Sequence, residues 1–206
     1  MRKFSELASK YHRLRSRSYH LLRLKNLRPL ISREDLVLDV GCGAGSFLLD
    51  IDSMWGIGLD VSRKMLRTSK QLLRNVKDRT DLVVGDAEVL PFRSSVFNAV
   101  IMMDVIEHIP SAATAIKESA RVMTDKGKIV INTPKHFLYP ALKLIELFRY
   151  KLSVPTKLIP IRELLSMLRA HYRIVAVRSV MFISRFVVAE KVAHIEILKN
   201  DSRRDR

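Results

Sequence analysis

Short apolar runs of strand length alternate along this chain with stretches of helical periodicity. The runs occupy residues 36–40, 54–60, 81–85, 97–104 and 128–133. Between them, apolar residues recur every three or four positions, as in 64–76 and 112–123. Continuous apolar strands separated by helices are typical of a parallel sheet with helices on both faces. The pattern therefore predicts an α/β fold.

The last third of the chain follows a different pattern. Tyr172–Phe182 and Ser184–Lys191 are two β-rich runs with almost no residues between them. A connection this short cannot hold a crossover helix, so the two runs must pair antiparallel. The prediction is a mostly parallel seven-stranded sheet that ends in a C-terminal antiparallel hairpin. A length of 206 residues suits one domain, 1–206.

The net charge of +16 comes from the two ends of the chain. Residues 1–33 carry ten basic residues and one acidic residue. Residues 34–142 carry thirteen basic and fourteen acidic residues, and residues 143–206 carry fourteen basic and six acidic residues. We expect 1–33 to be a helical segment with a basic face and 192–206 to be a basic, mobile tail. Such flanks suit an anionic partner, or they form a solvated surface.

The sequence argues against several classes of protein. Its longest charge-free runs, Val40–Leu49 and Ser94–Met103, have ten residues, whereas a membrane span needs about 18. The N-terminus is basic but lacks the apolar core of a secretory signal, so we expect a cytoplasmic protein. Cys42 is the single cysteine, which excludes an internal disulfide, and no metal-ligand spacing is present.

A glycine-rich loop, Asp39–Gly45, follows the first predicted strand and precedes a helical start at Ser46. Glycines at 41, 43 and 45 allow positive φ and a close approach of the backbone to a ligand. The loop lies at the carboxyl end of a strand, where doubly wound sheets bind ligands. Its third glycine comes one residue early for G-x-G-x-x-G, which disfavours a nicotinamide or flavin cofactor.

Asp60 closes the second predicted strand, 21 residues after Asp39. A carboxylate at this position can accept two hydrogen bonds from ribose hydroxyls. The alternative is an acid at the N-terminus of the following helix. Ser62 is the better N-cap candidate, so we favour the ribose role for Asp60.

Four predicted strands have an aspartate at or next to their carboxyl end: Asp39, Asp60, Asp86 and Asp104. Clustered carboxylates are costly without a partner. S-adenosylmethionine carries an amino group, two ribose hydroxyls, an adenine amine and a sulfonium, so it would compensate such a cluster.

The chain resembles the class I S-adenosylmethionine-dependent methyltransferases, and is most similar to the branch that methylates quinones, lipids and glycans. The resemblance implies a Rossmann-like fold. It departs from the family at Asp125–Lys128, where a Pro-Gly-Gly turn is usual. The matching segments are VLDVGCGAG at 37–45, GLDVS at 58–62, GDA at 85–87 with LPF at 90–92, and FNAV at 97–100 with EHIP at 107–110.

The resemblance implies a cofactor role for a defined set of residues. Asp39 orients the loop and the methionine amino group, and Asp60 holds the ribose. The remaining cofactor-binding residues are Tyr11, Gly41, Gly43 and Gly45, Val61, Asp86 and Ala87, and Met103 and Asp104. Tyr11 belongs to an N-terminal segment that often closes over the cofactor. Cys42, in the same loop, also belongs to this cofactor-binding set, and we expect it to be a small packing residue rather than a nucleophile.

Methyl transfer depends mainly on positioning the acceptor and excluding water. A base is needed only when the acceptor must lose a proton. His108 and Asp104, near the end of the fourth predicted strand, are the candidate catalytic residues. The alternative for His108, structural packing at a helix start, is the one we favour. His136 and Tyr139 are further candidates on the acceptor side.

Residues 134–170 form the predicted lid over the acceptor, with amphipathic helical periodicity in 136–150 and 161–170. An apolar lid edged by basic residues suits a lipophilic or amphipathic acceptor, including one at an acidic membrane surface. The predicted function is methyl transfer to a quinone, lipid or glycan. The alternatives are an RNA methyltransferase that uses the basic flanks and a non-catalytic S-adenosylmethionine-binding subunit.

Overall fold

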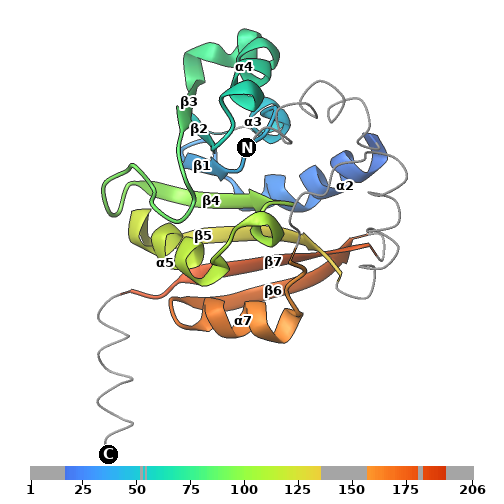
Figure 1. Cartoon of the computed structure of the whole chain (residues 1–206), viewed down its shortest axis with the longest axis vertical. Coiled ribbons are helices and arrows are strands. Elements are labelled where there is room, and N and C mark those ends of the chain that lie inside the picture. The colour runs from blue at the N-terminus through green and yellow to red at the C-terminus, as the bar shows by residue number, and fades with distance from the viewer. Residues whose placement is uncertain (1–16, 52, 54, 136–156, 181–182, 194–206) are drawn as a thin grey trace, which may run out of the picture.

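A computed structural model describes residues 17–51, 53, 55–135, 157–180 and 183–193. Within these residues, seven strands form one sheet in the order β3-β2-β1-β4-β5-β7-β6 (Figure 1). Their bounds are Leu36–Val40 for β1, Trp55–Asp60 for β2, Thr80–Val84 for β3, Phe97–Met103 for β4, Met123–Pro134 for β5, Tyr172–Val180 for β6 and Ser184–Lys191 for β7.

The pairing of the strands confirms the predicted fold class. β1 pairs parallel with both β2 and β4, β2 with β3, and β4 with β5. β7 runs antiparallel to its two neighbours, β5 and β6. One difference from the sequence pattern is that β5 begins at Met123, directly after a helix, and pairs there with Phe97.

Helices cover both faces of the sheet, as predicted. α5 (Ala112–Val122) and α7 (Ile161–Arg169) pack on one face, which Figure 1 shows toward the viewer. α2 (Arg17–Leu27), α3 (Ser46–Asp50) and α4 (Arg63–Leu72) pack on the other. Short 3-10 helices, η1, η2 and η3, occupy Arg28–Leu30, Leu73–Arg79 and Ile106–His108.

Two serines fix the starts of the helices that follow strand ends. Ser62 accepts a hydrogen bond from the Met65 N–H (3.3 Å) and caps α4, as the sequence predicts. Ser111 accepts one from the Thr114 N–H (3.3 Å) and caps α5. Such caps satisfy backbone donors that a helix start leaves unpaired.

The N-terminal helix differs in part from its predicted basic face. Leu24 and Leu27 of α2 are buried, which agrees with a packed helix. Arg23, however, is completely buried, whereas Leu21 and Leu22 are exposed. Arg23 therefore does not belong to the basic face expected for residues 1–33, because its partner is a carboxylate inside the protein.

Several predicted features lie outside the described residues. They are Tyr11, His136, Tyr139, the helical pattern at 136–150 and most of the tail at 192–206. Among the described residues, no helix has the length and apolar character needed to cross a membrane.

Two leucines of α2 provide a test of its packing. Leu27 is 0% exposed and Leu21 is 53% exposed. We expect Leu27→Ala to lower the free energy of unfolding by about 2–5 kcal/mol, because it leaves a cavity. Leu21→Ala should change it by less than about 0.5 kcal/mol. Urea unfolding followed by circular dichroism measures both, and equal effects would show that α2 does not pack as described.

Candidate cofactor and acceptor site

The loop between β1 and α3 has the geometry that its glycines allow. Gly41 and Gly43 have φ of +69° and +55°. The N–H groups of Gly41 and Cys42 donate to the Leu59 carbonyl at 2.7 and 3.0 Å, which ties the loop to β2. A Cβ at Gly41 would lie 2.2 Å from Val105 Cγ2. Only glycine fits there.

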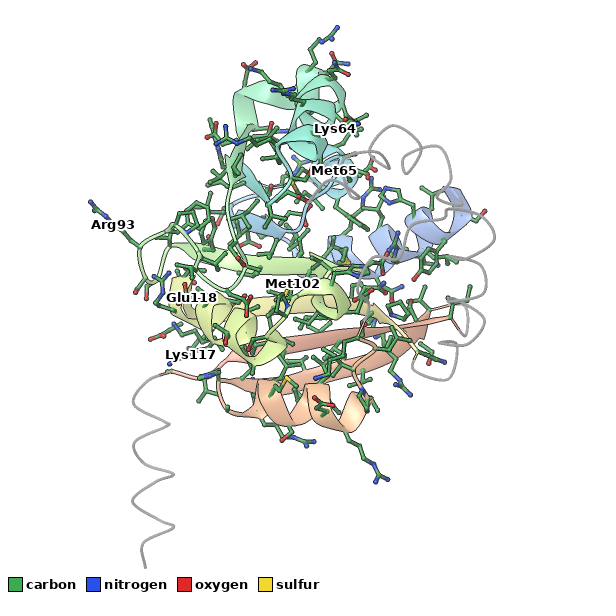
Figure 2. The ribbon with its side chains drawn as sticks, in the orientation of Figure 1. Lys64, Met65, Arg93, Met102, Lys117 and Glu118 are labelled. Atoms are coloured by element: carbon green, nitrogen blue, oxygen red, sulfur yellow. The ribbon has the colours of Figure 1, made fainter. Side chains whose placement is uncertain are left out.

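Gly43 presents bare backbone at the middle of the loop. A Cβ added there would meet one neighbour within 4 Å, the Met65 Cε at 3.2 Å. Met65 lies on α4, beside the loop (Figure 2). The Gly43 N–H is used, since it donates to Asp60 Oδ2 at 2.9 Å. This part of the loop is a cradle that a side chain would fill.

Both oxygens of Asp60 are held in place by backbone donors. Oδ2 accepts from the Gly43 N–H at 2.9 Å, and Oδ1 accepts from the Ser62 N–H at 2.8 Å. Burial raises the pKa of the Asp60 carboxyl, while the two hydrogen bonds oppose this rise. Each oxygen keeps a further lone pair, so the carboxylate can still accept two hydroxyls. Its contact with Ser62 also supports the turn into α4.

Apolar side chains are exposed just after β2 and at and beyond the end of β3. Val61, Val84 and Val89 are 45%, 46% and 74% exposed, although large apolar residues are usually buried. Ala87 is buried, and Asp86, which is exposed, accepts from the Glu88 N–H at 2.9 Å. A flat apolar ring with one polar edge would suit this surface.

An ion pair on α5 holds the loop that carries Asp86 and Ala87. Glu118 (Figure 2) pairs with Arg121, which lowers the pKa of Glu118. Glu118 also accepts from the Leu90 N–H at 2.9 Å, and Arg121 donates to the carbonyls of Leu90 and Phe92. The sequence analysis missed this support, since nothing in a helical E-x-x-R pair indicates its partner.

Two predicted residues of the loop region are buried. Asp39 is 1% exposed and Cys42 is 8% exposed. Burial and the nearby carboxylates of Asp39 and Asp60 raise the pKa of the Cys42 thiol. A Cβ at Gly58 would lie 2.8 Å from the Cys42 sulfur, so the thiol fills space against β2. These contacts agree with a packing role for Cys42.

A buried polar network surrounds Asp104 at the end of β4. Its Oδ2 accepts from Arg23, and its Oδ1 accepts from the side-chain amide of Asn132 on β5. The Asn132 amide nitrogen also donates to the Tyr19 hydroxyl at 3.3 Å. The Ser184 hydroxyl donates to the side-chain carbonyl oxygen of Asn132 at 3.0 Å. Burial, followed by the charge of Asp104, raises the pKa of Tyr19. The sequence analysis singled out only Asp104 and the neighbouring Met103, which is buried.

Glu107 is a second carboxyl group close to this network. It is 2% exposed and accepts from the Thr133 hydroxyl at 3.2 Å. Burial, followed by the negative charge of Asp104, raises its pKa to about 8. Its backbone carbonyl accepts from the Lys157 N–H at 2.8 Å. The adjacent His108 is the last residue of η3 and is half-buried.

The raised pKa of Glu107 has a consequence for stability. Between its ordinary value of 4.5 and about 8, the folded state binds the proton that the unfolded state releases. The free energy of unfolding should therefore fall as pH rises through this window, by up to about 1.4 kcal/mol per pH unit. We expect Glu107→Gln to flatten this slope in denaturation curves from pH 5 to 8. Glu34→Gln, at an exposed position, is the control and should keep it; an unchanged slope in Glu107→Gln would contradict the assignment.

Comparison with known proteins agrees with this geometry. Residues 38–131 match a family model described as a methyltransferase domain. Over 151 residues, the chain is 28% identical to a demethylmenaquinone methyltransferase of Lactococcus lactis subsp. lactis (strain IL1403). This match covers 68% of the chain. The chain spans about 60% of the relative's length.

Solved structures share the fold. One is a chain from the complex between the Haloferax volcanii Trm112 methyltransferase activator and the putative methyltransferase. It matches with a TM-score of 0.79 and 17% sequence identity, and the match covers 92% of this chain and 98% of that one. Another is a putative methyltransferase from Bacillus halodurans C-125, with a TM-score of 0.71, 16% identity and coverage of 84% and 99%. Residues 38–131 thus match a methyltransferase domain, and the described chain shares the fold of solved methyltransferase structures.

Proposed function

We propose that this chain transfers a methyl group from S-adenosylmethionine to a small, lipophilic acceptor. A quinone is the acceptor type that the relatives favour, and a lipid or glycan belongs to the same proposal. The observation that carries the proposal is the Asp60 carboxylate, fixed on one side by the Gly43 N–H and on the other by the Ser62 N–H.

The residues of the cradle fit this cofactor. Asp60 would accept the two ribose hydroxyls through its remaining lone pairs. The exposed side chains of Val61 and Val89 would cover the adenine ring, with Asp86 and Ala87 at its polar edge. The bare backbone of Gly43 leaves room for the cofactor to pass. Asp39 and Met103 would flank the methionine part.

When bound, the cofactor supplies a methyl group that its sulfonium already activates. The protein then has to orient the acceptor and exclude water. If the acceptor must lose a proton, Asp104 and His108 are the two candidates. The Asp104 side chain is 16% exposed, and its ion pair with Arg23 makes the carboxylate a weaker base. His108 is the second candidate, one residue beyond the buried Glu107.

The acceptor class rests on the relatives and on the fourth strand. A relative from Staphylococcus aureus (strain MRSA252), 26% identical over 164 residues, is also named demethylmenaquinone methyltransferase. The residues after β4, Asp104 to Glu107, lack the Asn/Asp-Pro-Pro-aromatic run usual in enzymes that methylate base amines. Both points support a small acceptor over a nucleic acid.

Binding of the cofactor is tested at Asp60. We expect Asp60→Ala to weaken S-adenosylmethionine binding at least about 10-fold in calorimetry, because hydrogen bonds to a charged group contribute about 1.5–3 kcal/mol. Asp78→Ala, at an exposed position before β3, should bind as the wild type does. Equal affinity of Asp60→Ala and wild type would exclude the ribose role.

The acceptor is tested by transfer of labelled methyl groups. The protein is incubated with methyl-labelled S-adenosylmethionine and the separated lipid, RNA and protein fractions of a cell extract. We expect label in the lipid fraction, where quinones partition, and a loss of that label with Asp60→Ala. Label in RNA alone would support the RNA methyltransferase, and cofactor binding without any transfer would support the non-catalytic subunit.

A further inference from the structure

We propose that Arg23 is a positioning residue, which fixes the end of β4 and the glycine-loop helix α3 relative to each other. This inference rests on the proposed function, because it concerns how the same site is assembled. Arg23 lies on α2, outside both the loop and the strand that it would position. No motif of the sequence analysis includes it.

The side chain of Arg23 contacts both halves of the site. It is completely buried, and its Nη1 donates to Asp104 Oδ2 at the end of β4. The guanidinium carbon lies 4.2 Å from the centre of the Tyr19 ring and 5.1 Å from that of Phe47. Phe47 is the second residue of α3, which begins directly after Gly45. One cation therefore joins the strand end to the loop helix.

The charges around Arg23 make this contact specific. Burying a guanidinium is unfavourable unless a carboxylate pairs with it. Two carboxyl groups are near, Asp104 and Glu107, and burial together with the charge of Asp104 raises the pKa of Glu107 to about 8, which favours its neutral form at pH 7. Arg23 and Asp104 thus form one balanced pair, and loss of either partner would leave the other charge buried.

Asp104 needs this support because its backbone is strained. Its φ is +55°, a value that is unusual for a residue with a side chain. Its N–H donates to the backbone carbonyl of Asn132 at 2.9 Å. Its two carboxylate oxygens accept from the side chains of Asn132 and Arg23. Such strain persists only where the surroundings fix it, and it clusters at functional sites.

A second contact ties α2 to α3. His20 Nε2 lies 2.8 Å from Asp50 Oδ2, and the His20 ring packs against Phe47 with 4.8 Å between ring centres. Residues 20 and 23 of α2 therefore attach to both ends of α3. Because α2 contacts the loop helix and the strand end together, its docking and cofactor binding should favour each other.

The affinity for S-adenosylmethionine tests this proposal. Calorimetry is done on wild type, Arg23→Met, Arg23→Lys and Lys25→Met, well below the melting temperature of each and with circular dichroism to confirm folding. Lys25 is exposed on the same helix, so Lys25→Met is the matched control. We expect a loss of at least about 10-fold for Arg23→Met, a smaller loss for Arg23→Lys and none beyond about twofold for the control.

A double-mutant cycle separates positioning from general stability. If Arg23 acts through Asp104, the Arg23→Met/Asp104→Asn protein should bind no more weakly than the weaker single variant. S-adenosylmethionine should also slow amide exchange in 17–27 of the wild type but not of Arg23→Met. Wild-type affinity in folded Arg23→Met, or fully additive losses, would overturn the proposal.

The proposed function fails in a different way. If wild type binds S-adenosylmethionine but labels no fraction, methyl transfer is excluded, while the role of Arg23 is still decided by the affinities. If wild type does not bind S-adenosylmethionine, both proposals are wrong.

Discussion

The parallel alignment of β1, β2 and β4 is the constraint on which the rest of the structure depends. It brings the carboxyl ends of these strands to one edge of the sheet, so the turns that follow them meet there. The glycine loop, Asp60 and Asp104 come from three different turns and share this edge for that reason alone. The antiparallel β7 adds Ser184 to the same edge from the opposite direction.

Hydrogen bonds then convert this meeting of turns into a defined site. Asp60 joins the first turn to the second through Gly43 and Ser62. The ion pair of Glu118 and Arg121 holds the third turn against α5. Around Asp104, the side chain of Asn132 links β4 to β5 and α2. Each turn is therefore held by a contact outside its own sequence.

Local patterns predicted the parts of this structure that depend on local physics. Apolar runs gave the strands, the short gap before Ser184 gave the hairpin, and the polar residue before Arg63 gave the cap of α4. Arg23 could not be predicted, because one arginine among several on a basic helix carries no sign of burial. Its position is decided by Asp104, 81 residues away, and only the folded chain brings the two together.

The buried pair of Arg23 and Asp104 also constrains how the sequence can diverge. A neutral residue at either position alone leaves an uncompensated charge inside the protein, which is strongly unfavourable. Among related chains, the two positions should therefore change together, to another ion pair or to two uncharged residues. The amino-terminal helix and the fourth strand would then evolve together, although no sequence motif contains both of them.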